Sequence, residues 1–251
     1  MSGINKVAQL TITFWIMKMC ATTLAETGGD LLAKKVGLGY MYGSIVLIGV
    51  FLITLAVQLR AKAFHPILYW AVILSTATAG TCISDYMDRT LALGYPLVSL
   101  ILTMVLLGVL IVWRLLLGSI AVSHVSDSKT ETFYWTAILV SNTLGTAVGD
   151  FLADSSGLGF LLSSVLIAAV IGAIAVLYLT TSISRTVLFW TAFVLTRPFG
   201  ATFGDFLTMD GDEGGLGFGT VGSSAVLFVI FAMLVLYSLR VWQRQQSPAA
   251  A

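Results

Sequence analysis

Eight apolar segments of about 20 residues alternate along the chain with shorter polar stretches. A helix of about 20 residues rises about 30 Å, which matches the hydrocarbon core of a bilayer. The pattern therefore predicts eight transmembrane helices in an all-α integral membrane fold. The odd-numbered segments contain polar residues within the apolar run and are expected at 9–31, 66–87, 131–152 and 186–207. The even-numbered segments are almost uncharged and are expected at 40–59, 94–117, 158–180 and 217–240.

Each pair of segments carries the same motif, so the chain contains four copies of a helical hairpin. In every copy an aspartate lies 15 residues after a tryptophan, and a Gly-Leu-aromatic signal follows the aspartate. The tryptophans are Trp15, Trp70, Trp135 and Trp190, and the aspartates are Asp30, Asp85, Asp150 and Asp205. This repeat divides a single transmembrane domain, 1–251, at about 9–62, 63–122, 128–182 and 183–244. Because each copy has two helices, every copy starts on the same side of the membrane and has the same orientation. We therefore expect parallel pseudo-symmetry about an axis along the membrane normal.

Composition supports a membrane protein and excludes several other classes. The chain is 58% hydrophobic and 10% charged, whereas roughly a quarter of a soluble domain is charged. A net charge of +1 and the lack of a long basic run exclude a nucleic-acid partner. The chain has two cysteines without CxxC spacing, no phosphate-binding loop and no nucleophile–base pair, so we expect neither an enzyme nor a covalent cofactor.

The distribution of charged residues predicts the orientation in the membrane. Basic residues follow the even-numbered segments, whereas the opposite loops are mostly acidic. By the positive-inside rule both termini are cytoplasmic, in a multi-pass protein of the bacterial inner membrane. The motif aspartates then lie near the outer ends of their helices. An aromatic residue precedes each motif tryptophan, and we expect these pairs to anchor the inner membrane interface, to which Lys18 should also extend.

The motif places polar and small residues on separate helix faces. Positions 8, 11 and 15 after the tryptophan share one polar stripe, while small residues recur at positions 10 and 14. The small face should pack helices closely, within one chain or in a homo-oligomer. A carboxylate in hydrocarbon costs about 2.5–3.5 kcal/mol, so the acidic side chains should converge on the shared axis. The predicted ion-binding residues are Glu26, Asp30, Asp85, Asp150, Asp205, Thr23, Thr81, Thr146, Asn142 and Arg197, with the five carboxylates as metal ligands.

Carboxylate and hydroxyl oxygens are hard ligands. The leading hypothesis is therefore a transporter or channel for a small cation, such as the divalent ion Mn²⁺ carried as substrate. Arg197 occurs only in the fourth copy and needs a carboxylate partner, for which we expect Glu26 or a neighbouring aspartate. Two alternatives remain: a structural or partner-binding scaffold whose aspartates close hairpins, and an organic-cation transporter that uses aromatic side chains.

The segment ATTLAETGGD at 21–30 and the trailing GLGY or GLGF signal also carry a family resemblance. The chain resembles, over nearly its whole length, a bacterial family of uncharacterised membrane-anchored proteins built from four copies of a repeat of unknown function. The resemblance implies a polytopic inner-membrane protein and adds no substrate. The second copy departs from the pattern because it lacks the first glycine of the trailing signal, and the fourth departs through Arg197-Pro198 and a longer loop.

Overall fold

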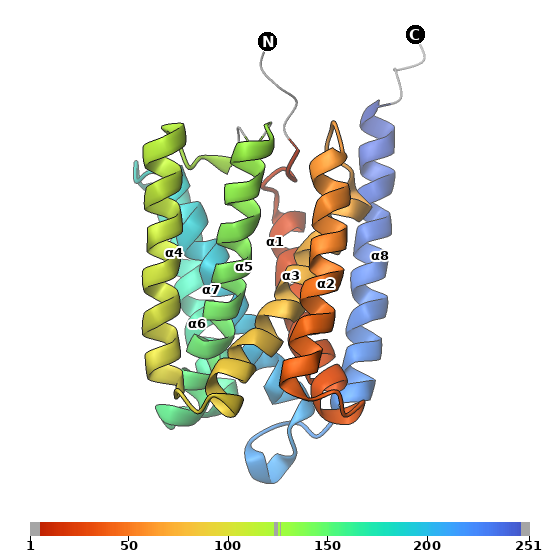
Figure 1. Cartoon of the computed structure of the whole chain (residues 1–251), viewed down its shortest axis with the longest axis vertical. Helices are drawn as coiled ribbons and strands as arrows, with labels where there is room; N and C mark the ends of the chain where they lie inside the picture. Colours follow the sequence, from red (N-terminus) through yellow and green to blue (C-terminus); the bar gives the residue numbers. More distant parts are fainter. Residues whose placement is uncertain (1–5, 123–124, 126, 247–251) are drawn as a thin grey trace.

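A computed structural model describes residues 6–122, 125 and 127–246, and within them it contains eight α-helices and no strand (Figure 1). The motif helices are α1 (Ile12–Asp30), α3 (Pro66–Asp85), α5 (Ser128–Asp150) and α7 (Arg185–Thr208). The other helices are α2 (Gly39–Arg60), α4 (Tyr95–Leu117), α6 (Gly159–Thr180) and α8 (Thr220–Gln246). The prediction of an all-helical chain with eight helices is confirmed.

The four motif helices pack as a ring inside the bundle. Both α1 and α5 contact α3 and α7, so each motif helix has two motif neighbours. The other helices lie outside this ring, where α2 packs against α3, α4 against α5, α6 against α7 and α8 against α1. Each outer helix therefore covers the motif helix of the next repeat. Helix α1 begins and α8 ends at one end of the bundle, the terminus end; the motif aspartates lie at the opposite, aspartate end (Figure 1).

The outer helices expose apolar side chains. Only 22%, 17%, 22% and 11% of the most apolar stretch is buried in α2, α4, α6 and α8, against 72% and 67% in α3 and α5. Ile53, Leu115 and Leu179 are 68%, 77% and 79% exposed. Soluble proteins rarely expose so much contiguous apolar surface. Among the described residues, six helices are long and apolar enough to cross a membrane, which is compatible with a multi-pass membrane protein.

The remaining two helices, α1 and α7, carry charged residues inside the apolar run. These are Lys18, Glu26 and Asp30 in α1, and Arg197 and Asp205 in α7. None of the five is more than 7% exposed. Their charges therefore face other protein groups rather than the surroundings of the bundle.

A π-helical turn follows the motif aspartate in the first three repeats, at η1 (Leu31–Lys35), η2 (Tyr86–Thr90) and η4 (Phe151–Ser155). In each, a backbone N–H donates to the carbonyl five residues earlier at 2.9 Å. In the fourth repeat α7 continues to Thr208, and a short 3₁₀ turn, η5 (Gly211–Glu213), lies in the longer loop. Single π turns within α-helices are frequent at functional sites.

The trailing Gly-Leu-Gly signal forms the turn into the second helix of a repeat. Gly37, Gly39, Gly157 and Gly159 have φ angles of +79°, +69°, +75° and +74°. Residues with a side chain rarely adopt these angles, which explains the two glycines. In the second repeat Ala92 takes the first of the two positions with φ at +53°, so that turn holds an alanine in a strained conformation.

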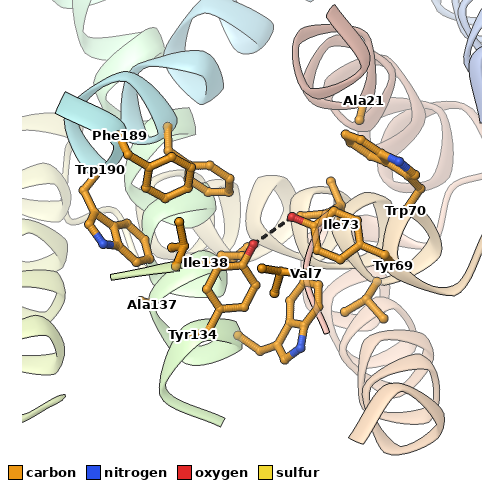
Figure 2. Packing of buried hydrophobic residues seen from close by; sticks show 14 of the residues in the cluster. Val7, Ala21, Tyr69, Trp70, Ile73, Tyr134, Ala137, Ile138, Phe189 and Trp190 are labelled. Atoms are coloured by element: carbon orange, nitrogen blue, oxygen red, sulfur yellow. Dashed lines mark hydrogen bonds between the residues drawn. The ribbon is translucent and has the colours of Figure 1, made fainter. Parts of the chain in front are cut away.

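The aromatic residues at the start of the motif helices pack in the interior. Tyr69, Trp70, Tyr134 and Trp190 are at most 5% exposed, and the hydroxyls of Tyr69 and Tyr134 lie 2.7 Å apart (Figure 2). Rings from the outer helices cover them: Phe231 of α8 packs edge-on against Trp70, and α4 contributes a ring against Trp190. The prediction that the aromatic pairs anchor a membrane interface is therefore wrong for these four residues, because neighbouring helices enclose them, whereas Trp15 is only partly buried.

Candidate functional site

One face of each motif helix lines the axis of the ring. Positions −1, 3, 7, 11 and 15, counted from the motif tryptophan, recur every four residues and share a face. From the terminus end, the five layers are Phe14, Tyr69, Tyr134 and Phe189; Lys18, Ile73, Ile138 and Phe193; Thr22, Ala77, Asn142 and Arg197; Glu26, Thr81, Thr146 and Ala201; and Asp30, Asp85, Asp150 and Asp205. None of these residues is more than 7% exposed. A rise of 1.5 Å per residue separates the first and last layers by about 24 Å.

Bonds across the ring show that the middle layers meet at the axis. Lys18 on α1 donates to Asn142 Oδ1 on α5 at 3.3 Å, although α1 and α5 are not neighbours in the ring. Arg197 on α7 donates to the carbonyl of Ala77 at 3.4 Å and to the Thr81 hydroxyl, both on α3 opposite. The side chains of Lys18, Asn142, Arg197 and Thr81 and the carbonyl of Ala77 therefore form one polar column through the centre of the bundle.

The small residues of the motif allow this close approach. A Cβ on Gly145 would collide with Arg197 on the next helix, and one on Gly200 would lie 2.6 Å from the Thr22 carbonyl carbon. A Cβ on Gly80 would lie 2.9 Å from the backbone of α5. Each motif helix thus places its small face against the polar face of the next one around the ring. The predicted small-residue packing operates within the chain.

Arg197 and Glu26 form an ion pair in the middle of the column. Arg197 Nη2 lies 2.9 Å from Glu26 Oε2, and their side chains are 0% and 4% exposed. Arg197 Nη1 also donates to the Thr22 carbonyl at 3.1 Å, and the Thr81 hydroxyl donates to Glu26 Oε2 at 3.4 Å. The expectation that Glu26 is the partner of Arg197 is confirmed. In this arrangement the two residues neutralise each other.

Lys18 lies one turn closer to the terminus end and is 0% exposed. Its Nζ is 4.1 Å from the centre of the Phe193 ring and bonds to Asn142. The Asn142 amide nitrogen donates to Thr76 Oγ1 at 3.0 Å, which directs the amide oxygen toward Lys18. The prediction that Lys18 extends to the membrane interface is therefore wrong. Its position in the inward stripe leaves it enclosed by the ring.

The four motif aspartates are not equivalent. Asp30 pairs with Lys34 at 2.7 Å, and Asp85 pairs with Arg89 at 3.4 Å, in each case with the residue four positions later. The fourth residue after Asp150 is Asp154, and the fourth after Asp205 is a methionine. Two aspartates are therefore neutralised within their own turn, and the other two lack such a cation.

Asp150 and Asp205 lie on neighbouring helices, and their carboxylates have no ion pair or hydrogen bond with any described residue. Asp150 interacts electrostatically with Asp85, Asp205 and Arg89, and Asp205 also interacts with Lys34, so these charged side chains share one region although neither carboxylate forms an ion pair. One turn before Asp150, on the same face, Thr146 Oγ1 is buried without a hydrogen-bond partner, and so is Ser84 Oγ on α3. These oxygen atoms all lie in the last two turns of their motif helices at the aspartate end and have no ion pair or hydrogen bond with a described residue.

The described residues include no group of three or more His, Cys, Asp or Glu side chains placed to hold a metal ion. The carboxylates are close enough to repel one another but do not converge as a complete ligand set. Thr23, another candidate from the sequence, donates its hydroxyl to the Met19 carbonyl of its own helix at 3.0 Å. Thr78 and Thr143, at the same motif position, also bond to their own helices.

A second buried ion pair at the terminus end was missed from the sequence. Lys6 Nζ lies 2.9 Å from Glu131 Oε2, and Gln58 Nε2 donates to Glu131 Oε1 at 2.9 Å. The side chains of Lys6 and Glu131 are 9% and 0% exposed. The only sequence signal was Glu131 itself, an acid at the start of an apolar helix. This group joins the segment before α1 to the end of α2 and the start of α5.

The fold and this column define a repeat protein in which four helical hairpins surround a buried polar axis. The family model described as Repeat of Unknown Function (DUF347) matches the chain four times, at residues 13–64, 68–116, 133–184 and 188–243. The chain belongs to this family, as the resemblance of its motifs suggested. No curated protein and no solved structure matches the chain.

Proposed function

We propose that the protein is a membrane transporter for a small cation. In this proposal all eight helices cross the bacterial inner membrane, and the axis of the ring lies along the membrane normal with both termini in the cytoplasm. The column of about 24 Å would then extend through most of a hydrocarbon core of about 30 Å. The apolar outer helices support this arrangement, because lipid would cover them while the charged helices α1 and α7 stay enclosed.

The observation that carries the proposal is the cluster around Asp150 and Asp205. Both carboxylates lie at the aspartate end without an ion pair to any described cation, and the buried hydroxyls of Thr146 and Ser84, in the last two turns of α5 and α3, have no hydrogen-bond partner. Buried polar groups normally have hydrogen-bond partners, and exceptions call for an explanation. A cation between Asp150 and Asp205 would supply the missing interactions and relieve their mutual repulsion.

The number of ligands indicates the kind of cation. Two carboxylates and two hydroxyls cannot replace the whole hydration shell of a divalent ion. Mg²⁺ commonly keeps several waters in protein sites and binds through one or two carboxylates. We therefore propose that the cluster binds a small cation that keeps part of its water, with Mn²⁺ and Mg²⁺ as candidates. This agrees with the lack of a three-ligand group among the described residues.

The charges around the cluster favour cations over anions. The turns and loops at the aspartate end carry the exposed acids Asp154, Asp210, Asp212 and Glu213 together with the bases Lys34, Lys35 and Arg89, and two of these bases already pair with Asp30 and Asp85. An excess of charge of one sign raises the local concentration of oppositely charged ions. An anion would meet repulsion both in these loops and at Asp150 and Asp205.

One observation favours the alternative of a membrane scaffold. Asp30 and Asp85 are each tied to a cation in their own turn, as expected for aspartates that only close hairpins. The scaffold alternative does not account for Asp150 and Asp205, which lack such cations. The two functions differ in one measurable property, which is cation binding by the folded protein.

Thermal unfolding in detergent tests the proposal. The protein would be heated with Mn²⁺, Mg²⁺, Na⁺, K⁺ or tetramethylammonium, the last as a probe for organic cations. A ligand that binds only the folded state at 100 times its Kd stabilises it by about 2.7 kcal/mol. We expect a small inorganic cation to raise the melting temperature of the wild type but not that of the Asp150→Asn/Asp205→Asn variant.

The variant Asp154→Asn is the matched control, because it removes an exposed carboxylate one turn from Asp150. It should keep the wild-type response. If no tested cation stabilises the wild type, or if the double variant responds as the wild type does, the proposed cation site is wrong and the scaffold function is favoured.

A further inference from the structure

The column contains more buried positive charge than its middle layers can neutralise. Between the tyrosine layer and the aspartate layer, the charged residues are Lys18, Arg197 and Glu26. Glu26 is bonded to Arg197. Lys18 is held by a neutral amide and an aromatic ring, and no described carboxylate lies within ion-pair distance of it. A buried ammonium without a counter-charge is costly, so this position needs a specific reason.

The groups that face Lys18 are few. Toward the axis, the titratable or charged residues are Tyr69 on α3, Tyr134 on α5, Arg197 on α7 and Glu26 on α1 itself. Helix α8 packs against α1 from outside, and its described titratable residues, Tyr237, Arg240 and Arg244, lie toward its carboxyl end. The full charge that acts on Lys18 is that of Arg197, which repels it.

We infer that Lys18 is the proton-carrying residue of the transporter, and that a cation passes it only when Lys18 is neutral. The inference rests on the proposed function, because it assigns the coupling step of the same pathway. In the charged state the ammonium blocks the axis by repulsion. When it loses a proton, its charge changes from +1 to 0 and the same side chain offers a lone pair to the passing cation. One proton is therefore released for each opening of this barrier.

The surroundings accept both protonation states of Lys18 without rearrangement. An amine and an ammonium can each donate an N–H to Asn142 Oδ1, which Thr76 holds in place. The Phe193 ring adds an attraction for the charged form only. Lysines act as proton carriers when such a site keeps both forms accessible, whereas arginine stays charged throughout.

The released proton has a polar route toward the terminus end. The hydrogen-bonded hydroxyls of Tyr69 and Tyr134 form the next layer of the column. Beyond them, Glu131 lies one turn earlier on α5 and interacts electrostatically with Tyr134. Chains of ionisable side chains within a membrane protein are typical of proton pathways. The proton would leave to water at the terminus end, and Lys18 would regain a proton from the aspartate end before the next cycle, so that protons cross the membrane in the direction opposite to the cation.

The test measures cation and proton movement together. Wild-type protein in sealed vesicles would receive external Mn²⁺, or Na⁺ in parallel, while one dye reports the cation and a second reports lumenal pH. We expect cation influx with a matching rise in lumenal pH as protons leave. Lys18→Met should still pass the cation but lose the pH change. Lys18→Arg should pass neither, because its charge is permanent.

Lys129→Met is the control, since it removes an exposed lysine in the first turn of α5, outside the column, and should behave as the wild type. Lys18→Gln serves as a second neutral variant if Lys18→Met does not fold. Cation flux in the wild type without a pH change overturns the inference alone, as does a normal pH change in the neutral variants or normal flux in Lys18→Arg. Lack of cation flux in the wild type overturns the proposed function and the inference with it.

Discussion

Arg197 on α7 and Glu26 on α1 are 171 residues apart in the chain and meet through an Nη2–Oε2 contact of 2.9 Å at the centre of the helix ring. The pair joins the last motif helix to the first. It therefore closes the ring by a charged contact at the place where the chain itself provides no connection. The bond to Thr81 extends this contact to α3.

Breaking this pair should destabilise the protein strongly. Removal of one partner leaves the other charge buried, which typically costs about 3–5 kcal/mol. We expect Glu26→Gln and Arg197→Met each to lower the free energy of unfolding in detergent by about this amount. The double variant should lose less than the sum, since no unpaired charge remains. Losses that simply add in the double-mutant cycle would show that the two side chains are not coupled.

The small face of the motif predicts a second effect on stability. Gly145→Ala and Gly200→Ala force a methyl group into Arg197 and into the backbone of α1, respectively. Overpacking of a close helix contact typically costs about 1–3 kcal/mol. Gly172→Ala in α6 is the control, because no heavy atom lies within 4 Å of its added carbon, and alanine favours helix. Thermal unfolding should rank Gly172→Ala at or above the wild type and both ring variants below it.

The turn of the second repeat should gain stability from a glycine. Ala92 adopts a left-handed φ of +53°, where a side chain costs about 1–2 kcal/mol. Glycine removes that strain but has more freedom in the unfolded chain, so Ala92→Gly should stabilise the protein by about 0.5–1 kcal/mol. The reverse change in the first repeat, Gly37→Ala, should destabilise it. A lower melting temperature for Ala92→Gly would contradict the proposed equivalence of these turns.

The start of α5 makes a pH-dependent contribution. Hydrogen bonds from the Thr130 hydroxyl and amide, with one from the Lys129 amide, hold the pKa of Asp127 below its ordinary value. The charged cap is therefore favoured in the folded state, and its stabilisation is complete above the unfolded-state pKa. It is lost as the pH falls through the lower folded-state pKa. Asp127→Ala should cost about 1 kcal/mol at pH 7, and this difference should shrink below about pH 4. A difference that stays constant with pH would argue against a carboxylate cap.

Much of the fold could be predicted because the motif repeats. A fixed distance from tryptophan to aspartate locates four equivalent helices, and the polar and small faces follow from helix geometry alone. The partner of Arg197 could be predicted as well, because a buried guanidinium requires an acid and Glu26 is the additional acid of the first repeat.

Other features depend on how the ring closes. Lys18 lies four residues after Phe14, and the stripe that contains both faces inward only because α1 packs against α3 and α7. The aromatic residues at the start of the motif helices also depend on tertiary packing. Their sequence is typical of a membrane interface, and no local pattern shows that α4 and α8 cover them. The difference between the aspartates was visible in the sequence as Lys34, Arg89 and Asp154. The structure shows the consequence of this difference, because Lys34 and Arg89 each pair with the aspartate four positions earlier.

Cation flux through reconstituted vesicles tests the central claim most directly, because the claim is that the unpaired carboxylates of Asp150 and Asp205 bind the transported ion. We predict influx of a small cation with wild-type protein and with Asp154→Asn, and its loss with Asp150→Asn/Asp205→Asn that still folds. Equal influx through the wild type and the double variant, or no influx of any tested cation through the wild type, would contradict the account.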